Sequence, residues 1–253
     1  MATECPIEGT QGESYDRVKL LQYGNYQVEI LGHPITGTAL ATTNPYIVEH
    51  IENDVGIRDS TKLQIWSMML HPAVVLVDYD TVLQKPLDND IDLILANENL
   101  KGFYIQSPPD EKTGEAGVDT GFMIIKPSIQ EFNNIVNAYI NTPFDPKTGW
   151  NGKGHHNFKG GMGISGFLSY YFANDSGYEK LNRCVYAHTA DDDCLATTSL
   201  EDSKAAKASA TICGNPRDCP YDRSHWSAAK KGACETLHRK CKSFTLYHAY
   251  DHV

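Results

Sequence analysis

Residues 72–86 read Pro72-Ala-Val-Val-Leu-Val-Asp-Tyr-Asp-Thr-Val-Leu-Gln-Lys-Pro86. The run of apolar and mostly β-branched residues from Ala73 to Val77 predicts a central parallel strand that is covered on both faces. Two acids, Asp78 and Asp80, follow this run directly. Because a covered strand has no solvent face for them, we expect both at its C-terminal end, where open α/β sheets bind their ligands.

The two acids are spaced so that both side chains point to the same side of an extended chain. Carboxylates held this close repel each other unless a cation lies between them, and oxygen ligands suit Mg²⁺ or Mn²⁺. The pattern therefore predicts a metal site that holds a phosphate-bearing ligand. The alternative is a pair of solvated loop acids, because Asp-x-Asp alone is a common sequence.

The composition suits one globular α/β domain with at most a small appendage. The chain has 253 residues, of which 41% are hydrophobic and 21% charged. Its net charge of −10, without a basic stripe, argues against nucleic acids and acidic membranes as partners. No apolar run approaches the roughly 20 residues of a membrane-spanning helix. The N-terminus lacks the basic and apolar regions of a signal peptide.

The cysteines cluster near the C-terminus: six of seven follow residue 183, at Cys184, Cys194, Cys213, Cys219, Cys234 and Cys241. This clustering predicts a segment stapled by disulfides in the secretory lumen, such as the Golgi, although the lack of a signal peptide leaves a cytoplasmic location open. A structural zinc is the rival interpretation, but no Cys-x-x-Cys pair is present. Asn174-Asp-Ser176 matches a glycosylation sequon.

Hydrophobic periodicity and turn residues predict the elements along the chain. We expect strands at 26–31, 91–96, 119–126 and 242–253. We expect helices that begin at Ser60, at Ile129 with Ser128 as the N-cap, and at Ile164. Residues 36–53, 101–118 and 141–163 are predicted to be loops, with a short element of uncertain type at 45–51. Residues 1–183 form the predicted α/β core, with 1–14 frayed, and 184–253 form a Cys-rich segment whose last strand returns to the core.

The loop at 141–163 is long enough to predict a function, because loops of this length in compact domains are usually functional or disordered. Trp150, His155 and His156 lie within it. The adjacent histidines are either metal ligands or plain surface residues.

Five segments, taken in order, resemble glycosyltransferase family 8, the glycogenin-like and galactinol-synthase-like retaining enzymes of GT-A fold. They are Thr61-Lys-Leu-Gln-Ile-Trp66, Val74 to Asp88, Asp119-Thr-Gly-Phe-Met-Ile-Ile-Lys-Pro-Ser128, Gly166-Phe-Leu-Ser-Tyr-Tyr-Phe172 and Thr245-Leu-Tyr-His248. The resemblance implies a GT-A fold with a mostly parallel mixed sheet and helices on both faces. It runs from about Ser60 to the end, and the first βα unit of the family is missing.

The resemblance also implies roles for individual residues. Mn²⁺, or Mg²⁺, would be bound by Asp78, Asp80 and His248 and would bridge the diphosphate of a UDP-sugar donor. The resemblance places Lys62, Tyr79 and Gly121 at the bound donor, and it assigns Asp119 to the sugar hydroxyls. Lys62 and Asp119 are thus the candidate catalytic residues. The acceptor would be a carbohydrate, a polyol or a glycoprotein.

The chain departs from the family where an acid and a glutamine are usual, because Ile164 and Ser165 stand there. Two hypotheses follow. The first is a metal-dependent retaining hexosyltransferase that uses a UDP-sugar. The second is a truncated or degenerate GT-A domain that is a non-catalytic binding or structural protein. A metal-dependent phosphoryl or nucleotidyl transferase is a third hypothesis. The sequence lacks the Gly-rich phosphate loop that this hypothesis leads us to expect.

Overall fold

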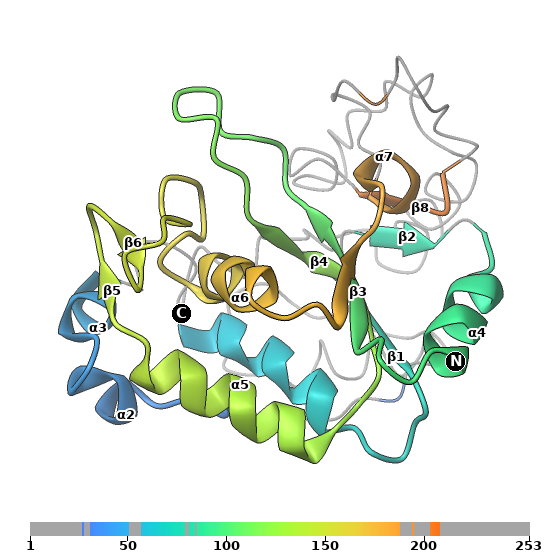
Figure 1. The fold of residues 1–253 in the computed structure, drawn as a ribbon, viewed down its shortest axis with the longest axis horizontal. Coiled ribbons are helices and arrows are strands. Elements are labelled where there is room, and N and C mark those ends of the chain that lie inside the picture. Colours follow the sequence, from blue (N-terminus) through green and yellow to red (C-terminus); the bar gives the residue numbers. More distant parts are fainter. Residues whose placement is uncertain are drawn as a thin grey trace, which may run out of the picture.

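The computed structural model describes residues 27, 31–50, 57–78, 81–83, 85–187, 194 and 203–207. Its main sheet has the strand order β1-β4-β3-β7, formed by Val74–Val77, Val118–Ile125, Gly102–Gln106 and Tyr178–Lys180 (Figure 1). β4 is antiparallel to both β1 and β3, and β3 is parallel to β7. Three of the four strands therefore run in one direction, which confirms the predicted mixed, mostly parallel α/β sheet.

The side chains of the strands alternate between two hydrophobic clusters, one on each face of the sheet. Met123 and Ile125 of β4 enter the first cluster, whereas Phe122 and Ile124 enter the second. β1 divides in the same way, because Val74 and Leu76 pack on the first cluster and Val75 on the second. This two-sided burial explains the apolar run before Asp78. The prediction of a parallel neighbour is wrong for the described residues, because there β1 pairs antiparallel with β4.

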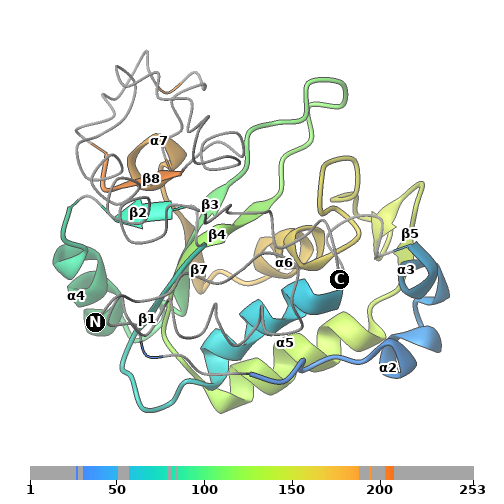
Figure 2. The ribbon, with the colours of Figure 1, turned by 180° about the vertical axis from the view of Figure 1, so that it is seen from behind.

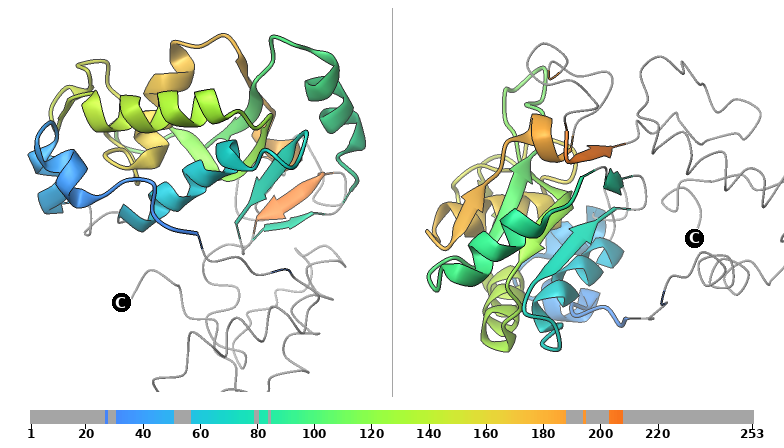
Figure 3. Two further views of the ribbon diagram at one scale, coloured as in Figure 1. Left: turned by 90° about the horizontal axis from the view of Figure 1, so that it is seen from below. Right: turned by 90° about the vertical axis from the view of Figure 1, so that its right-hand side faces the viewer.

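Helices cover both faces of the sheet (Figure 3). The first cluster lies under the 3₁₀ helix η2 (Ile57–Ser67), α5 (Ile129–Asn141) and α6 (Ile164–Ala173). The second lies under α4 (Asp88–Ala96) and α7 (Arg183–Tyr186). η2 and α5 run side by side in the front and back views (Figures 1 and 2). The result is a three-layer arrangement in which η2 reaches the C-terminal end of β1.

Three predicted elements are confirmed closely. β4 spans the predicted strand 119–126 to within one residue at each end. α5 begins after Ser128, whose hydroxyl accepts a hydrogen bond from the backbone N–H of Glu131, as an N-cap does. α6 begins at Ile164 as predicted. α5 buries residues at helical spacing, Glu131, Ile135 and Tyr139, whereas β4 is buried at almost every position and is followed by Pro127.

Two predicted element types are wrong. Residues 91–96 lie in α4 and not in a strand, because Asp90 and Ile94 share its buried face while Leu93 and Leu95 are exposed. Asp88 and Asp90 also place negative charge in the first turn, where the helix dipole favours it. The predicted loop at 36–53 contains α2 (Gly37–Ala41) and α3 (Pro45–His50).

Boundaries also differ from the predictions. β3 occupies the first part of the predicted loop 101–118. η2 begins three residues before Ser60, which is buried within it and is not a cap. Met69 and Leu70, which follow the end of η2 at Ser67, are exposed.

The predicted loop 141–163 contains a small hairpin of β5 (Phe144–Asp145) and β6 (Gly149–Trp150). Trp150 is fully buried, and its indole N–H donates to the carbonyl of Gly161 at 2.9 Å. This tryptophan therefore packs in the core and is not an exposed functional side chain. Gly149, with φ 78°, passes so close to Gly154 that a Cβ would lie 1.9 Å from the carbonyl oxygen.

The described part of the C-terminal segment packs on the core. β8 (Ala205–Lys207) pairs antiparallel with β2 (Thr81–Leu83), and Tyr186 and Ala205 join the second cluster. Cys184 and Cys194 form a disulfide with their Cα atoms 5.1 Å apart. This bond is compatible with the predicted lumenal location. Within the described residues, no helix is long and apolar enough to cross a membrane. The division at residue 183 stays a prediction.

Candidate functional site

The site is organised around the ammonium group of Lys62, which η2 directs to the C-terminal end of β1. Its Nζ lies 3.0 Å from Oδ1 of Asp59 and 3.1 Å from Oδ1 of Asp78. It also donates a hydrogen bond to the hydroxyl of Thr120 at 3.2 Å. We call Asp59, Lys62, Asp78 and Thr120 the Lys62 cluster. It joins a helix and two strands at one edge of the sheet, as the sequence predicted for Lys62 and Asp78.

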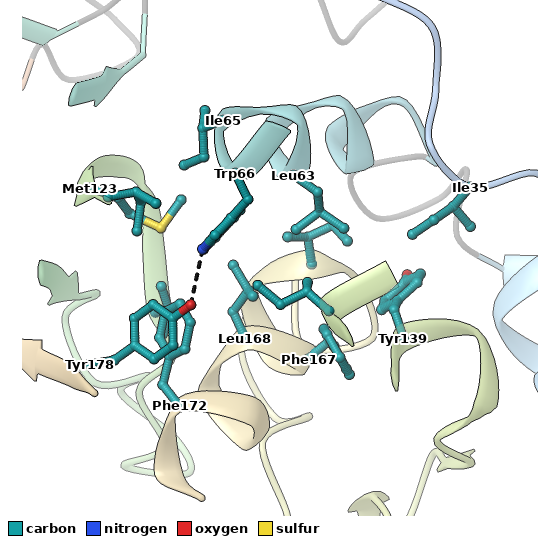
Figure 4. Packing of buried hydrophobic residues seen from close by; sticks show 14 of the residues in the cluster. Ile35, Leu63, Ile65, Trp66, Met123, Tyr139, Phe167, Leu168, Phe172 and Tyr178 are labelled. Atoms are coloured by element: carbon teal, nitrogen blue, oxygen red, sulfur yellow. Dashed lines mark hydrogen bonds between the residues drawn. The ribbon is translucent and has the colours of Figure 1, made fainter. Parts of the chain in front are cut away.

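η2 holds Lys62 in place because a single residue, Trp66, is anchored twice. The carbonyl of Trp66 accepts a hydrogen bond from the N–H of Ser128 at 2.9 Å. Its indole N–H donates to the hydroxyl of Tyr178 at 3.0 Å, and the ring lies among buried apolar side chains (Figure 4). About one helical turn therefore separates Lys62 from a tryptophan that is held at both its backbone and its side chain.

Asp59 is more buried than the two charged residues beside it, because its side chain is 3% exposed, against 17% for Lys62 and 25% for Asp78. Burial raises the pKa of this carboxyl above its ordinary value, and the neighbouring charges of Asp78 and Asp119 act in the same direction. Lys62 opposes these effects through its charge and its contact without reversing them. The cluster therefore concentrates negative charge, among the described side chains, around one lysine.

An irregularity in β4 lies between Asp119 and Met123 and directs the residues there toward this cluster. Tyr104 of β3 pairs with Met123, but the following residue, Ile105, already pairs with Asp119. The intervening residues of β4 leave the pairing with β3, a type of bulge that commonly re-aims side chains near functional sites. They stay joined to β1, because the N–H of Asp78 donates to the carbonyl of Gly121 at 2.9 Å.

Asp119 and Gly121 are tied to each other at the same edge. The backbone N–H of Gly121 donates to Oδ1 of Asp119 at 2.8 Å. The two backbone groups of Gly121 thus fix Asp119 on one side and Asp78 on the other. The structure brings together four of the predicted site residues, Lys62, Asp78, Asp119 and Gly121. The others, Tyr79, Asp80 and His248, lie outside the described residues.

A divalent metal ion suits the chemistry of this edge but not the described residues by themselves. Asp78 provides a carboxylate at the end of β1, and its Oδ1 is paired with Lys62. In the part of the chain that the structure describes, no three His, Cys, Asp or Glu side chains are arranged to hold a metal ion. A site here therefore depends on Asp80 and His248, the two predicted ligands outside that part.

The predicted histidine pair lies in a loop that is clamped by Glu115. Its two carboxylate oxygens accept hydrogen bonds from the backbone N–H groups of His156 and Asn157, at 2.8 and 2.9 Å. His155 is half-buried with φ 65°, and burial lowers the pKa of its imidazole. The pair therefore lies where this loop is hydrogen-bonded, through His156 and Asn157, to the connection between β3 and β4.

Sequence reasoning missed two members of the cluster, Asp59 and Thr120. Asp59 precedes Lys62 by three residues, a spacing that usually indicates an exposed ion pair on a helix. The spacing could have identified Asp59 as a partner of Lys62. It could not have shown that Asp59 is buried. Thr120 carries no such signal, because only the irregularity in β4 turns its hydroxyl toward Lys62.

Comparisons with known proteins add a distant likeness. No protein-family model and no curated protein matches this sequence. Among solved structures, the chain is similar to the glycosyltransferase GlyE of Streptococcus pneumoniae TIGR4, with 13% identity and a TM-score of 0.41, over 71% of this chain and 41% of that chain. This chain thus spans less than half of the length of GlyE.

A second similar structure is a glycosyltransferase involved in the glycosylation of the major capsid of PBCV-1. The identity is 11% and the TM-score 0.39, over 78% of this chain and 85% of that chain. Both neighbours are glycosyltransferases. With TM-scores below 0.5, these likenesses show neither a family nor an activity for this chain.

Proposed function

We propose that this chain is a metal-dependent, family-8-like retaining glycosyltransferase that moves a hexose from a UDP-sugar to a carbohydrate, polyol or glycoprotein acceptor. The observation that carries the proposal is the position of Lys62. Its ammonium contacts Asp59, Asp78 and Thr120 at the C-terminal end of β1, beside Asp119. Open α/β sheets bind phosphate-bearing ligands at this end of their strands.

Each group at this edge has a part in the proposal. Asp78, with Asp80 and His248, would hold Mn²⁺ or Mg²⁺, which when bound neutralises charge on the leaving diphosphate. Lys62 supplies a positive charge for the diphosphate or the sugar. Asp119 accepts hydrogen bonds from sugar hydroxyls, and Asp59 keeps the lysine pointed at the strand end. The carboxylates around Lys62 support the choice of a cationic cofactor, because their mutual repulsion falls when a cation binds.

Thermal unfolding with and without ligands tests the proposal. Mn²⁺ together with UDP raises the Tm of the wild-type protein, because a ligand that binds only the folded state stabilises it by mass action. Asp80→Ala and Asp78→Ala abolish the rise. Asp92→Ala, an exposed acid of α4, is the matched control and keeps it. A wild-type Tm that does not respond to saturating Mn²⁺ and UDP contradicts the proposal.

One observation favours the non-catalytic alternative. At the position where the family resemblance expects an acid, Ile164 is 2% exposed and belongs to the first hydrophobic cluster. The start of α6 is also tightly packed, because a Cβ on Gly166 would lie 1.8 Å from the carbonyl oxygen of Gly161. In this alternative the chain binds a nucleotide-sugar, or only a metal, without transferring the sugar.

Hydrolysis of UDP-sugars by the pure protein separates the two functions. Slow release of UDP that disappears in Asp80→Ala supports a transferase and excludes the non-catalytic alternative. A Tm that rises with Mn²⁺ and UDP, without any release of UDP from a panel of UDP-hexoses, supports a binding protein.

A further inference from the structure

The sequence contains one Asn-x-Ser/Thr triplet with a middle residue other than proline, Asn174-Asp175-Ser176. This triplet is the acceptor pattern for N-glycosylation, and the proposed transferase chemistry makes no use of it. In the structure, Asn174 is the C-cap of α6, and the chain then turns into β7. Asn174 and Ser176 are exposed, while Asp175 is half-buried. The two residues that the pattern requires therefore lie at the surface.

The turn holds Asn174 in a way that is compatible with a glycan. The side-chain amide Nδ2 donates a hydrogen bond to the carbonyl of Tyr170 at 2.7 Å. A primary amide has two N–H groups, and a sugar replaces one hydrogen and leaves the other for Tyr170. Asp175 fixes the middle of the turn, because its carboxylate is paired with Lys101 at 2.6 Å and accepts from the N–H of Gly177 at 2.9 Å.

A surface pocket beside Asn174 has room for the first sugar ring. It has a volume of about 270 Å³ and is lined by Ala138, Thr142, Tyr170, Tyr171, Asn174 and Asp175. Tyrosine combines an apolar ring with a polar tip, and both match the surface of a sugar. The pocket lies between the C-terminal parts of α5 and α6, so a glycan on Asn174 covers a depression and does not meet a protruding side chain.

A glycan at this position also leaves the Lys62 cluster accessible. Asp175 is paired with Lys101, which directly precedes β3, and the first residue of β3 pairs with Ile125 at the far end of β4. Asp119 pairs with Ile105, three residues further along β3, which corresponds to roughly 10 Å along that strand. Asn174 is thus at the opposite end of the sheet from the candidate site.

The disulfide provides an independent indication of the compartment. Cys184 and Cys194 are bonded, and such bonds form and persist in oxidising compartments such as the lumen of the endoplasmic reticulum. N-glycosylation of Asn-x-Ser/Thr sequons is a feature of secreted proteins. A chain that folds with this disulfide therefore exposes Asn174 to the machinery that modifies sequons.

We propose that Asn174 carries an N-linked glycan whose first sugar lies over the pocket between α5 and α6. The donor is an oligosaccharide linked to a polyisoprenoid diphosphate. A bond forms between Asn174 Nδ2 and the anomeric carbon of the sugar, and the bond from that carbon to the diphosphate oxygen breaks. The leaving diphosphate takes the electron pair, and the amide nitrogen loses one proton.

The test expresses the full chain in cultured eukaryotic cells behind a cleavable signal sequence. A C-terminal tag with its own sequon reports entry into the lumen, and only molecules with a glycan on the tag are scored. Peptide N-glycosidase is expected to remove two glycans from the wild-type protein, and mass spectrometry places one of them on Asn174. Asn174→Gln and Ser176→Ala lose one glycan, whereas Ser176→Thr keeps both.

Two further outcomes decide the proposal. Asn182→Gln, a nearby asparagine that is followed by Arg183 and Cys184, is the matched control and keeps both glycans. A wild-type protein that carries only the glycan of the tag overturns the proposal, whatever the ligand response of the Lys62 cluster. Conversely, a chain that does not bind Mn²⁺ or UDP leaves the glycosylation result unaffected.

Discussion

Two lysines at opposite ends of the sheet have similar partners. Lys62 lies between Asp59 and Asp78, at 3.0 and 3.1 Å, and Lys101 lies between Glu131 and Asp175, at 3.1 and 2.6 Å. We call the second group, with Tyr171 and Tyr178, the Lys101 cluster. In the structure each lysine lies between two acids, so the ion pairs alone do not separate the candidate site from a structural cluster.

The two clusters differ in the partners of their carboxylate groups. In the Lys101 cluster, Oε1 of Glu131 accepts from the hydroxyls of Tyr171 and Tyr178, and Oε2 is paired with Lys101. In the Lys62 cluster, burial raises the pKa of Asp59, and the charges of Asp78 and Asp119 act in the same direction. Glu131 of the first arrangement is thus paired through both carboxylate oxygens, whereas the proposed function has the second arrangement bind a cation.

The largest expected effect is on Glu131. Its side chain is 8% exposed and accepts three hydrogen bonds, so Glu131→Ala leaves two tyrosine hydroxyls without this acceptor and removes one of the two acids that Lys101 contacts. We expect a loss of about 3–5 kcal/mol in the free energy of unfolding, measured by urea denaturation. Glu131→Gln keeps the shape and one carbonyl acceptor and is expected to cost less. Equal losses would show that charge and not hydrogen bonding dominates the cluster.

Tyr178→Phe tests whether the two clusters are coupled through Trp66. The change removes the acceptor of the buried indole N–H and one donor to Glu131, and we expect it to cost about 1–3 kcal/mol. The Tm response to Mn²⁺ with UDP should persist, because the second anchor of η2, the bond from Ser128 to Trp66, remains. Loss of that response with little loss of stability would show that Trp66 positions Lys62 through its side chain.

The sequence predicts the parts of the fold in which an apolar run or an apolar period is bounded by clear start and stop residues. β1, β4, α5 with its Ser128 cap, and α6 were predictable because their apolar residues and boundary residues agree. α4 was not, because a run of apolar residues does not separate a buried strand from a helix. Its signals were the acids of the first turn and the spacing of Leu87, Asp90 and Ile94, all buried on one face.

The candidate site was predictable only in part, for a similar reason. Lys62, Asp78, Asp119 and Gly121 come from segments whose order resembles a known family, and the fold brings them together. Asp59 was missed because burial decides its role, and burial depends on the packing of η2 against the sheet. Thr120 was missed because its direction depends on a strand irregularity that has no sequence signature here.

The sharpest test of the comparison is a matched pair, Lys62→Met and Lys101→Met. Both remove a charge and keep much of the apolar stem, and we expect each to cost about 1–2 kcal/mol, since two carboxylates lose their cationic partner. Lys62→Met is expected to lose the Tm response to Mn²⁺ with UDP, whereas Lys101→Met keeps it. Equal responses in the two variants would remove the distinction between a functional and a structural lysine.

The smallest expected effect is a dependence on pH at Asp175. Burial acts to raise the pKa of its carboxyl, but the hydrogen bonds from Lys101 and the N–H of Gly177 outweigh burial, so the pKa is lowered. The carboxylate therefore adds stability that is complete above its unfolded pKa near 4 and is lost as the pH falls through the folded value. Asp175→Asn is expected to cost about 1 kcal/mol at pH 7 and nothing near pH 2, measured by urea unfolding. Asp92→Asn is the exposed control.

Asp59 should show the opposite sign, which completes the contrast between the clusters. Its pKa is raised in the folded state, mainly by burial, so the folded protein holds this proton more tightly than the unfolded chain. The contribution of Asp59 to stability is therefore lost as the pH rises from about 4 through the folded pKa. Relative to wild type, Asp59→Asn then gains stability with rising pH, while Asp175→Asn loses it. If the stability differences of the two variants changed with pH in the same direction, the contrast between the two clusters would be contradicted. Both acids would then be held by their lysines alone.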